Sequence, residues 1–171
     1  MAIRRELVER VDERDQVMEV VERGEAVRRG WLHRIATTVC RDAEGRILVH
    51  RRPDGMSRFP GQYNWMVGGA VDVGESYAEG AAREVEEELG VRVAVRHGVT
   101  FLCRGEISPY WMGVHEAVVP ASAISPDPAE LAWHGWWTEG ELRDAMGRMP
   151  FVSDAVEAYE RLRASRCSTG R

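Results

Sequence analysis

The alternation of apolar and polar residues predicts a chain rich in strands, with a few helices. Two β-prone runs at residues 6–11 and 16–20 flank a polar turn, a pattern typical of a β-hairpin, and a short helix is expected at 22–29. Further strands are expected at residues 35–40, 46–51, 65–68, 91–96, 99–104, 111–119 and 133–137. Residues 53–64 contain proline and glycine and are expected to form an exposed loop, whereas residues 139–147 and 153–164 are expected to be helices.

The clearest helix prediction covers residues 76–89. Ser76 and Glu79 form the S-x-x-E pattern of a capping box, and Gly90 supplies the residue that ends a helix. The apolar residues at three- and four-residue steps predict the buried face: Ala78, Ala82, Val85 and Leu89. Together the elements indicate an α+β protein with layered α/β/α architecture.

Length and charge limit the organisation and the class of partner. At 171 residues, the chain is expected to form one domain at residues 31–165, with an N-terminal extension at 1–30 and a flexible tail at 166–171. The net charge of −5 argues against binding to nucleic acid or to a membrane surface. No apolar run approaches the roughly 18 residues that a membrane span needs. Three cysteines with no metal-binding spacing are expected in a reduced cytoplasm.

Four acidic residues occur within one stretch of five, at Glu84, Glu86, Glu87 and Glu88. A helix turns about 100° per residue, so all of these except Glu86 lie on one side. Carboxylates grouped in this way suit a hard divalent cation such as Mg²⁺, although a solvated acidic surface has the same pattern. Gly68 and Gly69 end the preceding strand, where the backbone can approach a ligand closely.

This segment resembles the Nudix box, G-x5-E-x7-R-E-U-x-E-E-x-G-U, where U is a bulky aliphatic residue. The fixed positions are matched by Gly69, Glu75, Arg83, Glu84, Val85, Glu87, Glu88, Gly90 and Val91. The resemblance implies the Nudix fold, a mixed β-sheet between helices, and hydrolysis of a diphosphate linkage with Mg²⁺, for which Mn²⁺ can substitute. It implies that Glu84, Glu87 and Glu88 bind metal, with the Gly68 carbonyl as a further ligand. Arg83 and Glu75 would brace the helix and the loop.

Hydrolysis also needs a base that takes a proton from the attacking water. A carboxylate of the box can serve, and so can a glutamate outside it. Glu116 and Glu130 are candidates, although each is also compatible with an ordinary surface acid.

A second resemblance, to the isopentenyl-diphosphate isomerase branch of the superfamily, rests on the Leu32-His33-Arg34 stretch, the His50-Arg51-Arg52 strand end and Phe59-Pro60-Gly61. This branch needs a catalytic Cys and a His where the chain has Gly68 and Ala70, and a further His where it has Ala26. The resemblance therefore implies an isomerase-like member that has kept hydrolysis. His33 matches a metal ligand of that branch, but its partners are missing, which favours a structural histidine near the sheet edge.

Two further groups have alternative interpretations. Three arginines, Arg51, Arg52 and Arg58, are suited to clamp phosphates or to form a solvated basic strand end. The tryptophans of the second half are expected mainly in the core, with one exposed member able to stack on a nucleobase: Trp111, Trp133, Trp136 and Trp137.

The sequence therefore predicts a cytoplasmic Nudix phosphohydrolase, monomeric or homodimeric, whose partner is a small nucleotide. Expected substrates are nucleoside di- or triphosphates or related nucleotide derivatives. Two alternatives remain open: an isopentenyl-diphosphate isomerase-like enzyme, and a catalytically silent nucleotide-binding module.

Overall fold

The computed structural model describes residues 5–170, so residues 1–4 of the expected extension and residue 171 of the expected tail lie outside it. The described chain starts with an antiparallel hairpin, β1 (Leu7–Val11) and β2 (Val17–Glu22), followed by α1 (Arg23–Arg29). The hairpin turn is stabilised by Asp12, whose carboxylate accepts hydrogen bonds from the amides of Arg14 and Gln16 at 2.8 and 2.9 Å. The predicted N-terminal hairpin and short helix are confirmed.

The main sheet is mixed and has seven strands. These are β3 (Arg34–Arg41), β4 (Ile47–Arg51), β5 (Tyr63–Asn64), β6 (Val67–Ala70), β7 (Arg96–Cys103), β8 (Tyr110–Val118) and β9 (Trp133–Trp137). β3 runs parallel to β8 and antiparallel to β4 and β6, while β7 pairs with β8 and β5 and β9 pair with β4. This arrangement places the glycines of β6 directly beside the central strand.

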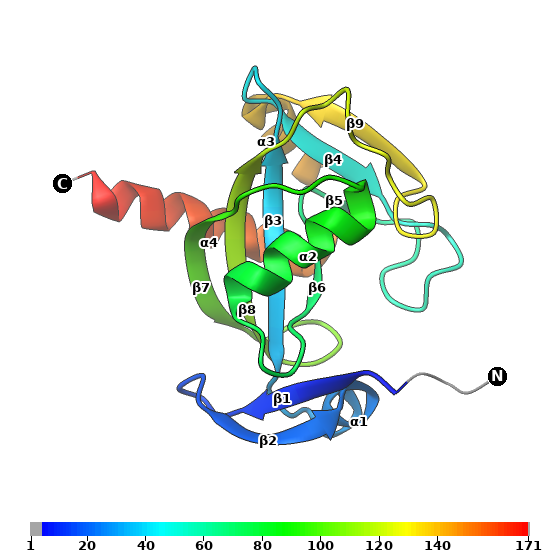
Figure 1. Cartoon of the computed structure of the whole chain (residues 1–171). Helices are drawn as coiled ribbons and strands as arrows, with labels where there is room; N and C mark the ends of the chain where they lie inside the picture. The colour runs from blue at the N-terminus through cyan, green and yellow to red at the C-terminus, as the bar shows by residue number, and fades with distance from the viewer. Residues whose placement is uncertain (1–4, 171) are drawn as a thin grey trace.

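Helices cover both faces of the sheet, as Figure 1 shows for α2 (Tyr77–Leu89) in front and α4 (Ser153–Thr169) behind. Successive strand residues point to opposite faces, so Val39 joins the core under α4 whereas Cys40 joins the core under α2. α3 (Glu139–Met146) contributes Leu142 to the α4 side. The predicted α/β/α layering is confirmed.

The ends of α2 follow the local sequence signals. The Ser76 hydroxyl accepts a hydrogen bond from the Glu79 amide at 3.2 Å, and the Glu79 carboxylate accepts one from the Ser76 amide at 2.7 Å. Gly90 ends the helix at a φ of 72°, a left-handed conformation that favours glycine.

The predicted buried face of α2 was wrong in its first half. Ala78 is exposed and Ala82 only half-buried, whereas Ala81 is fully buried with Val85 and Leu89. Gly80 and Ala81 are both buried, and a Cβ at position 80 would lie 3.4 Å from Val71 and 3.5 Å from Ala36, so the glycine lets the helix pack closely there. Glu88 lies on the same buried side, next to Leu89.

The strand expected at residues 91–96 was also wrong, since residues 91–95 form no strand. The alternate valines of this segment still point inward and pack beneath α2: Val91, Val93 and Val95. Their spacing reflects burial of one side of an extended segment that does not pair with a neighbouring strand. At the C-terminus, the flexible tail expected from residue 166 is instead helical as far as Thr169. Arg166 there forms an ion pair with Glu116, which gives the last turns a contact with the sheet. The division into domain and extension stays a prediction.

Candidate active site

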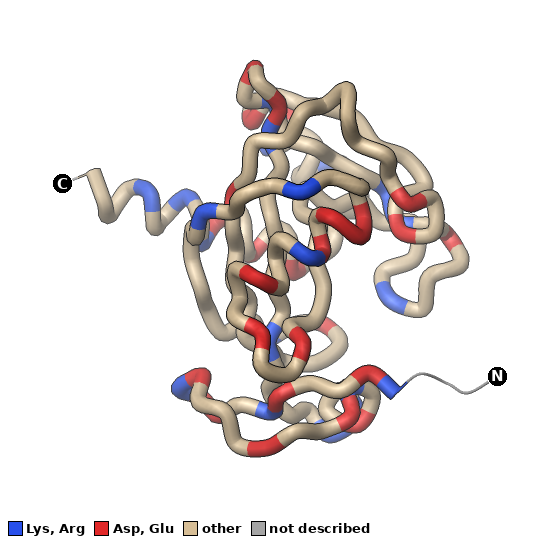
Figure 2. Tube along the Cα trace, in the orientation of Figure 1, with Lys and Arg blue, Asp and Glu red and all other residues tan. Residues whose placement is uncertain are grey.

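A cavity of about 570 Å³ opens between α2, β6, the loop after β4 and the N-terminal module, which consists of β1, β2 and α1. Its acidic wall contains Glu84, Glu87 and Glu88, all from α2. Figure 2 shows acidic positions repeating along this helix. The structure thus brings the three box carboxylates to one cavity.

The three carboxylates differ in their exposure to solvent. Glu88 is only 8% exposed, and the side chain of Glu84 is 14% exposed, whereas that of Glu87 is 59% exposed. Burial raises the pKa of the Glu88 carboxyl well above its ordinary value, and the negative charges of Glu84 and Glu130 raise it further. Burial also raises the pKa of Glu84. Buried carboxylates that disfavour one another's ionisation are stabilised by a cation placed among them.

The glycines of β6 allow the carboxylates to lie directly against the strand. A Cβ at position 69 would stand 2.6 Å from the Glu84 Oε1 atom, so only glycine leaves that carboxylate in place. The amide of Gly68 donates a hydrogen bond to the Glu88 carboxylate at 3.1 Å. A Cβ at position 68 would lie 2.1 Å from the carbonyl oxygen of Ala36.

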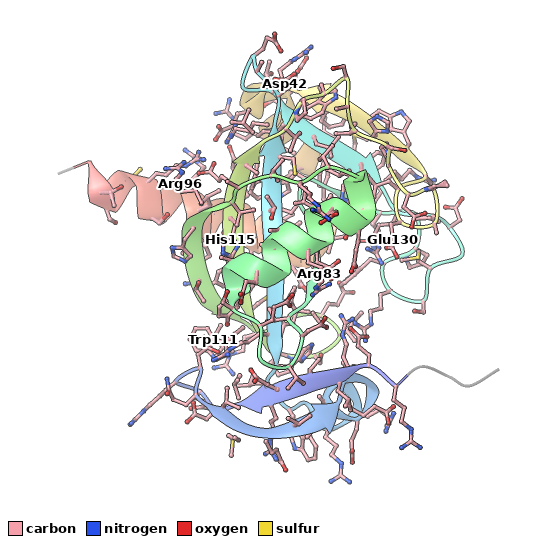
Figure 3. All side chains as sticks on the ribbon, viewed as in Figure 1. Asp42, Arg83, Arg96, Trp111, His115 and Glu130 are labelled. Atoms are coloured by element: carbon pink, nitrogen blue, oxygen red, sulfur yellow. The ribbon has the colours of Figure 1, made fainter. Side chains whose placement is uncertain are left out.

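Arg83 links the loop before α2 to the carboxylates (Figure 3). Its guanidinium donates to both carboxylate oxygens of Glu75, at 2.8 and 3.0 Å, and to the Ala70 carbonyl at 2.9 Å. It also donates to Glu84 at 2.7 Å and lies 3.4 Å from Glu87. The Arg83 hydrogen bonds lower the pKa of Glu75. This network fixes the Glu84 side chain relative to β6, as the expected bracing role of Arg83 and Glu75 requires.

The expected phosphate-binding arginines are divided by the structure. Arg52 and Arg58 line the cavity, and among residues 5–170 neither forms an ion pair. Arg51 is not part of the cavity lining; it pairs with Asp54 at 2.6 Å and steadies the loop after β4. A further arginine, Arg23 of α1, lines the cavity and was missed by the sequence reasoning, because nothing around it signals a site.

The two candidate bases outside the box are also separated. Glu130 lines the cavity, and Figure 3 shows it beside α2 on the opposite side of the molecule from Arg96. Glu116 is nearly buried, pairs with Arg96 at 2.8 Å and with Arg166, and is not part of the cavity lining. Glu116 therefore joins the sheet to α4, and Glu130 remains the candidate outside the box.

Two buried histidines line the cavity floor. His33 is 2% exposed, and neither ring nitrogen has a hydrogen-bond partner in the described part of the chain. Burial lowers its pKa to about 4, and the positive charges of Arg23 and Arg58 act in the same direction. His50 donates from Nε2 to the Met66 carbonyl at 2.7 Å, and burial lowers its pKa to about 4 as well. Both rings are therefore neutral near pH 7.

The tryptophans of the second half do not line this cavity. Trp133 of β9 is 42% exposed and packs edge-on against Tyr63 and at a tilt against Trp137. The Trp111 indole instead donates a hydrogen bond to the Asp12 carbonyl at 3.1 Å, which ties β8 to the N-terminal hairpin.

Comparison with known proteins places these features in a family. The NUDIX domain model matches residues 31–154. The chain belongs to the Nudix family.

Its relatives support the same assignment over nearly the full length. An uncharacterized Nudix hydrolase of Streptomyces coelicolor is 43% identical over 168 residues, covering 96% of this chain and 92% of that protein. A Nudix hydrolase of Deinococcus radiodurans is 35% identical over 143 residues, covering 80% of this chain and 81% of that one. These relatives carry hydrolase names, and the comparisons give no support to an isomerase-like branch.

Solved structures agree on the fold. A Deinococcus radiodurans crystal structure superposes with a TM-score of 0.77 at 28% identity and covers 92% of this chain and 99% of its own. A MutT protein of Methanosarcina mazei superposes with a TM-score of 0.65 at 21% identity, over 78% and 94% of the two chains, and is similar in fold. The predicted Nudix fold is confirmed.

Nudix proteins typically use a divalent metal ion, which the carboxylates of the box would have to hold. Among residues 5–170, no group of three or more His, Cys, Asp or Glu side chains is gathered closely enough to hold a metal in its present arrangement. The donors nevertheless suit a hard cation, because burial disfavours the ionised forms of the Glu84 and Glu88 carboxyls and a bound cation would stabilise them. Binding there would place a cation where Arg83 now supplies positive charge to Glu84.

Within residues 5–170, no helix combines the length and the apolar character that crossing a membrane requires. The expected cytoplasmic location and oligomeric state stay predictions.

Proposed function

We propose that this protein is a metal-dependent Nudix phosphohydrolase that cleaves a diphosphate linkage in a nucleoside di- or triphosphate or a related nucleotide derivative. The observation that carries the proposal is the division of charge within one cavity. Carboxylates Glu84 and Glu88 line one part of it, and Arg52 and Arg58 line another. A phosphate chain needs the arginines to bind its charge, and a cation site needs the carboxylates.

Glu84, Glu87 and Glu88 are the residues we assign to hold Mg²⁺ or Mn²⁺, with the Gly68 carbonyl as the expected further ligand. When bound, the metal neutralises phosphate charge and lowers the pKa of a coordinated water. Arg83 holds Glu84 against β6 and so keeps the carboxylates in a fixed position relative to the strand.

The remaining chemistry is carried by groups of this chain. The oxygen of the attacking water forms a bond to phosphorus, and the bond between phosphorus and the bridging oxygen breaks. The water gives its proton to a carboxylate, for which we propose Glu130, because it lines the cavity and forms no ion pair within residues 5–170. Arg52 and Arg58 bind the phosphate oxygens and offset the charge that leaves on the departing group.

Isomerase chemistry has a steric obstacle at the position where that branch needs its thiol. A Cβ at position 68 would lie only 2.1 Å from the Ala36 carbonyl oxygen, so a cysteine there would displace β3 or β6. The backbone at position 68 has room for glycine alone, and the described structure adds no observation in favour of the isomerase alternative.

The experiment is a hydrolysis assay with a panel of nucleoside di- and triphosphates and nucleotide conjugates, with Mg²⁺ or Mn²⁺ and with EDTA. We expect release of phosphate, pyrophosphate or a nucleoside monophosphate from one class of substrate, abolished by EDTA. Reaction in ¹⁸O-labelled water places the label on the phosphorus that is attacked. Tight nucleotide binding in calorimetry with no turnover in either metal would contradict the proposal and identify a silent binding module.

A further inference from the structure

Arg23 reaches the cavity from outside the matched Nudix region, since it is the first residue of α1 and the match begins at residue 31. Its guanidinium donates to both carboxylate oxygens of Glu6, at 3.0 and 3.2 Å. Its Nε atom is buried and has no hydrogen-bond partner in the described part of the chain. Arg23 lines the cavity, so the guanidinium donors that Glu6 does not engage can serve a ligand there.

Arg23 belongs to a group of three arginines on the cavity wall, with Arg52 and Arg58. Burial lowers the pKa of Arg58, and the positive charges of Arg23 and Arg52 act in the same direction, whereas the negative charge of Glu6 opposes them. Glu6 is the acid that pairs with this group, and it is exposed. Within residues 5–170, Arg52 and Arg58 form no ion pair, so two of the three guanidinium groups have no direct acidic partner.

A neutral histidine lies next to these arginines. His33 is buried and feels the charges of Arg23 and Arg58, and neither of its ring nitrogens has a partner within residues 5–170. A neutral imidazole offers one N–H donor and one acceptor. Three guanidinium groups beside an imidazole N–H that has no partner suit a ligand with several negatively charged acceptor oxygens.

The N-terminal module is anchored firmly enough to hold Arg23 in place. Asp15 of the hairpin turn accepts hydrogen bonds from Arg34 at 2.7 Å and from the Tyr77 hydroxyl at 2.9 Å. Glu9 of β1 accepts one from the Gly74 amide at 3.1 Å. Figure 1 shows the hairpin and α1 under the lower end of β3. These contacts join the module to the central strand and to the loop that precedes the box helix.

We propose that Arg23 joins Arg52 and Arg58 to bind one phosphate group of the substrate, so that the N-terminal module is part of the active site. The proposal rests on the proposed function for the identity of the ligand, a phosphate chain. Three guanidinium groups can bind one terminal phosphate through charge-assisted hydrogen bonds.

The test is calorimetric binding of inorganic pyrophosphate to the full chain in EDTA, which needs no metal and no turnover. We expect Arg23→Gln to weaken binding by about tenfold or more, the range for loss of a hydrogen bond to a charged group. Glu6→Gln should tighten binding several-fold, because it removes the carboxylate that competes for Arg23. Arg28→Gln is the matched control on the same helix: it is exposed, does not line the cavity, and should bind as the parent does.

If Arg23→Gln does not fold, Arg23→Lys replaces it in the binding experiment. It keeps the positive charge but loses the guanidinium donors, so it should also weaken pyrophosphate binding. In the hydrolysis assay, the Arg23 variants should raise KM more than they lower kcat. Unchanged pyrophosphate affinity in both Arg23 variants, or no pyrophosphate binding by the parent, would overturn the proposal. If the parent binds pyrophosphate through Arg23 but hydrolyses no nucleotide, the proposed function fails and the anion site stands.

Discussion

Replacing Glu88 by glutamine should raise the stability of the metal-free protein and abolish its activity. Glu88 is 8% exposed and accepts a hydrogen bond from the Gly68 amide, which a glutamine carbonyl can also accept. The substitution therefore removes a buried charge beside Glu84 and Glu130 while keeping the shape and that acceptor. We expect a gain on the order of 1–3 kcal/mol in the free energy of unfolding, the cost of burying an uncompensated polar group in mutational data.

The gain should depend on pH. Because burial raises the pKa of the folded carboxyl, the folded state holds a proton that the unfolded state has already lost between the two pKa values. The stability of the parent therefore falls as pH rises from the ordinary glutamate pKa through the raised one. Glu88→Gln has no such loss. The difference in the free energy of unfolding between this variant and the parent in EDTA should therefore grow with pH over that window and be largest above it.

The assay is thermal unfolding in EDTA across this pH range, followed by melts with Mg²⁺ and by kcat measurements. One kcal/mol corresponds to about 2–4 °C in Tm for a chain of this size. Mg²⁺ should raise the Tm of the parent but not of Glu88→Gln, and kcat should fall by about 100-fold or more because the metal supplies several kcal/mol of transition-state stabilisation.

Glu86→Gln is the matched control, because Glu86 is exposed on the same helix and pairs with Arg92 at 2.7 Å. A surface pair of this kind contributes about 0–1 kcal/mol, so this variant should keep its activity and its response to Mg²⁺. A Glu88→Gln variant that is less stable than the parent at high pH, or one with full kcat, would refute the reasoning.

The remaining predictions concern the strand and the helix that form the site. Gly69→Ala should keep the fold but lower kcat, because its Cβ would displace the side-chain carboxylate of Glu84. Gly68→Ala should lower the Tm sharply, because its Cβ would meet the Ala36 carbonyl oxygen at 2.1 Å. Melting and kinetics on both variants distinguish the two effects, and equal stability would contradict the contrast. Ser76→Ala should cost about 1 kcal/mol of stability by removing the cap of α2, measured by urea unfolding, and an unchanged midpoint would argue that the cap is dispensable. Arg83→Gln should lower activity about 10–100-fold, the usual effect of losing a partner that orients a metal ligand, and its Mg²⁺ titration should shift to higher concentration; unchanged kinetics would contradict the bracing role.

Local signals in the sequence predicted the site helix and its ends. Ser76, Glu79 and Gly90 act within one turn of their own positions, so the pattern alone determines where α2 begins and ends. The three box glutamates followed from helical spacing in the same way. The buried face of the first half of α2 was predicted wrongly, because it depends on how closely Gly80 lets the helix approach the sheet.

Features that depend on distant partners could not be predicted from the sequence. Val91 and the valines after it alternate like a strand, but whether a strand forms depends on a free neighbouring edge. Arg51 and Arg52 are adjacent, yet one pairs with Asp54 and the other lines the cavity. Arg23 enters the cavity only because the hairpin packs beneath β3, a tertiary contact with no local signature.

The most direct test of the central claim is nucleotide hydrolysis followed by ³¹P NMR in ¹⁸O-labelled water, comparing the parent with Glu88→Gln in Mg²⁺ and in EDTA. The account predicts labelled phosphate, pyrophosphate or nucleoside monophosphate from the parent in Mg²⁺ alone. Product formed at the parent rate by Glu88→Gln, or by the parent in EDTA, would contradict it.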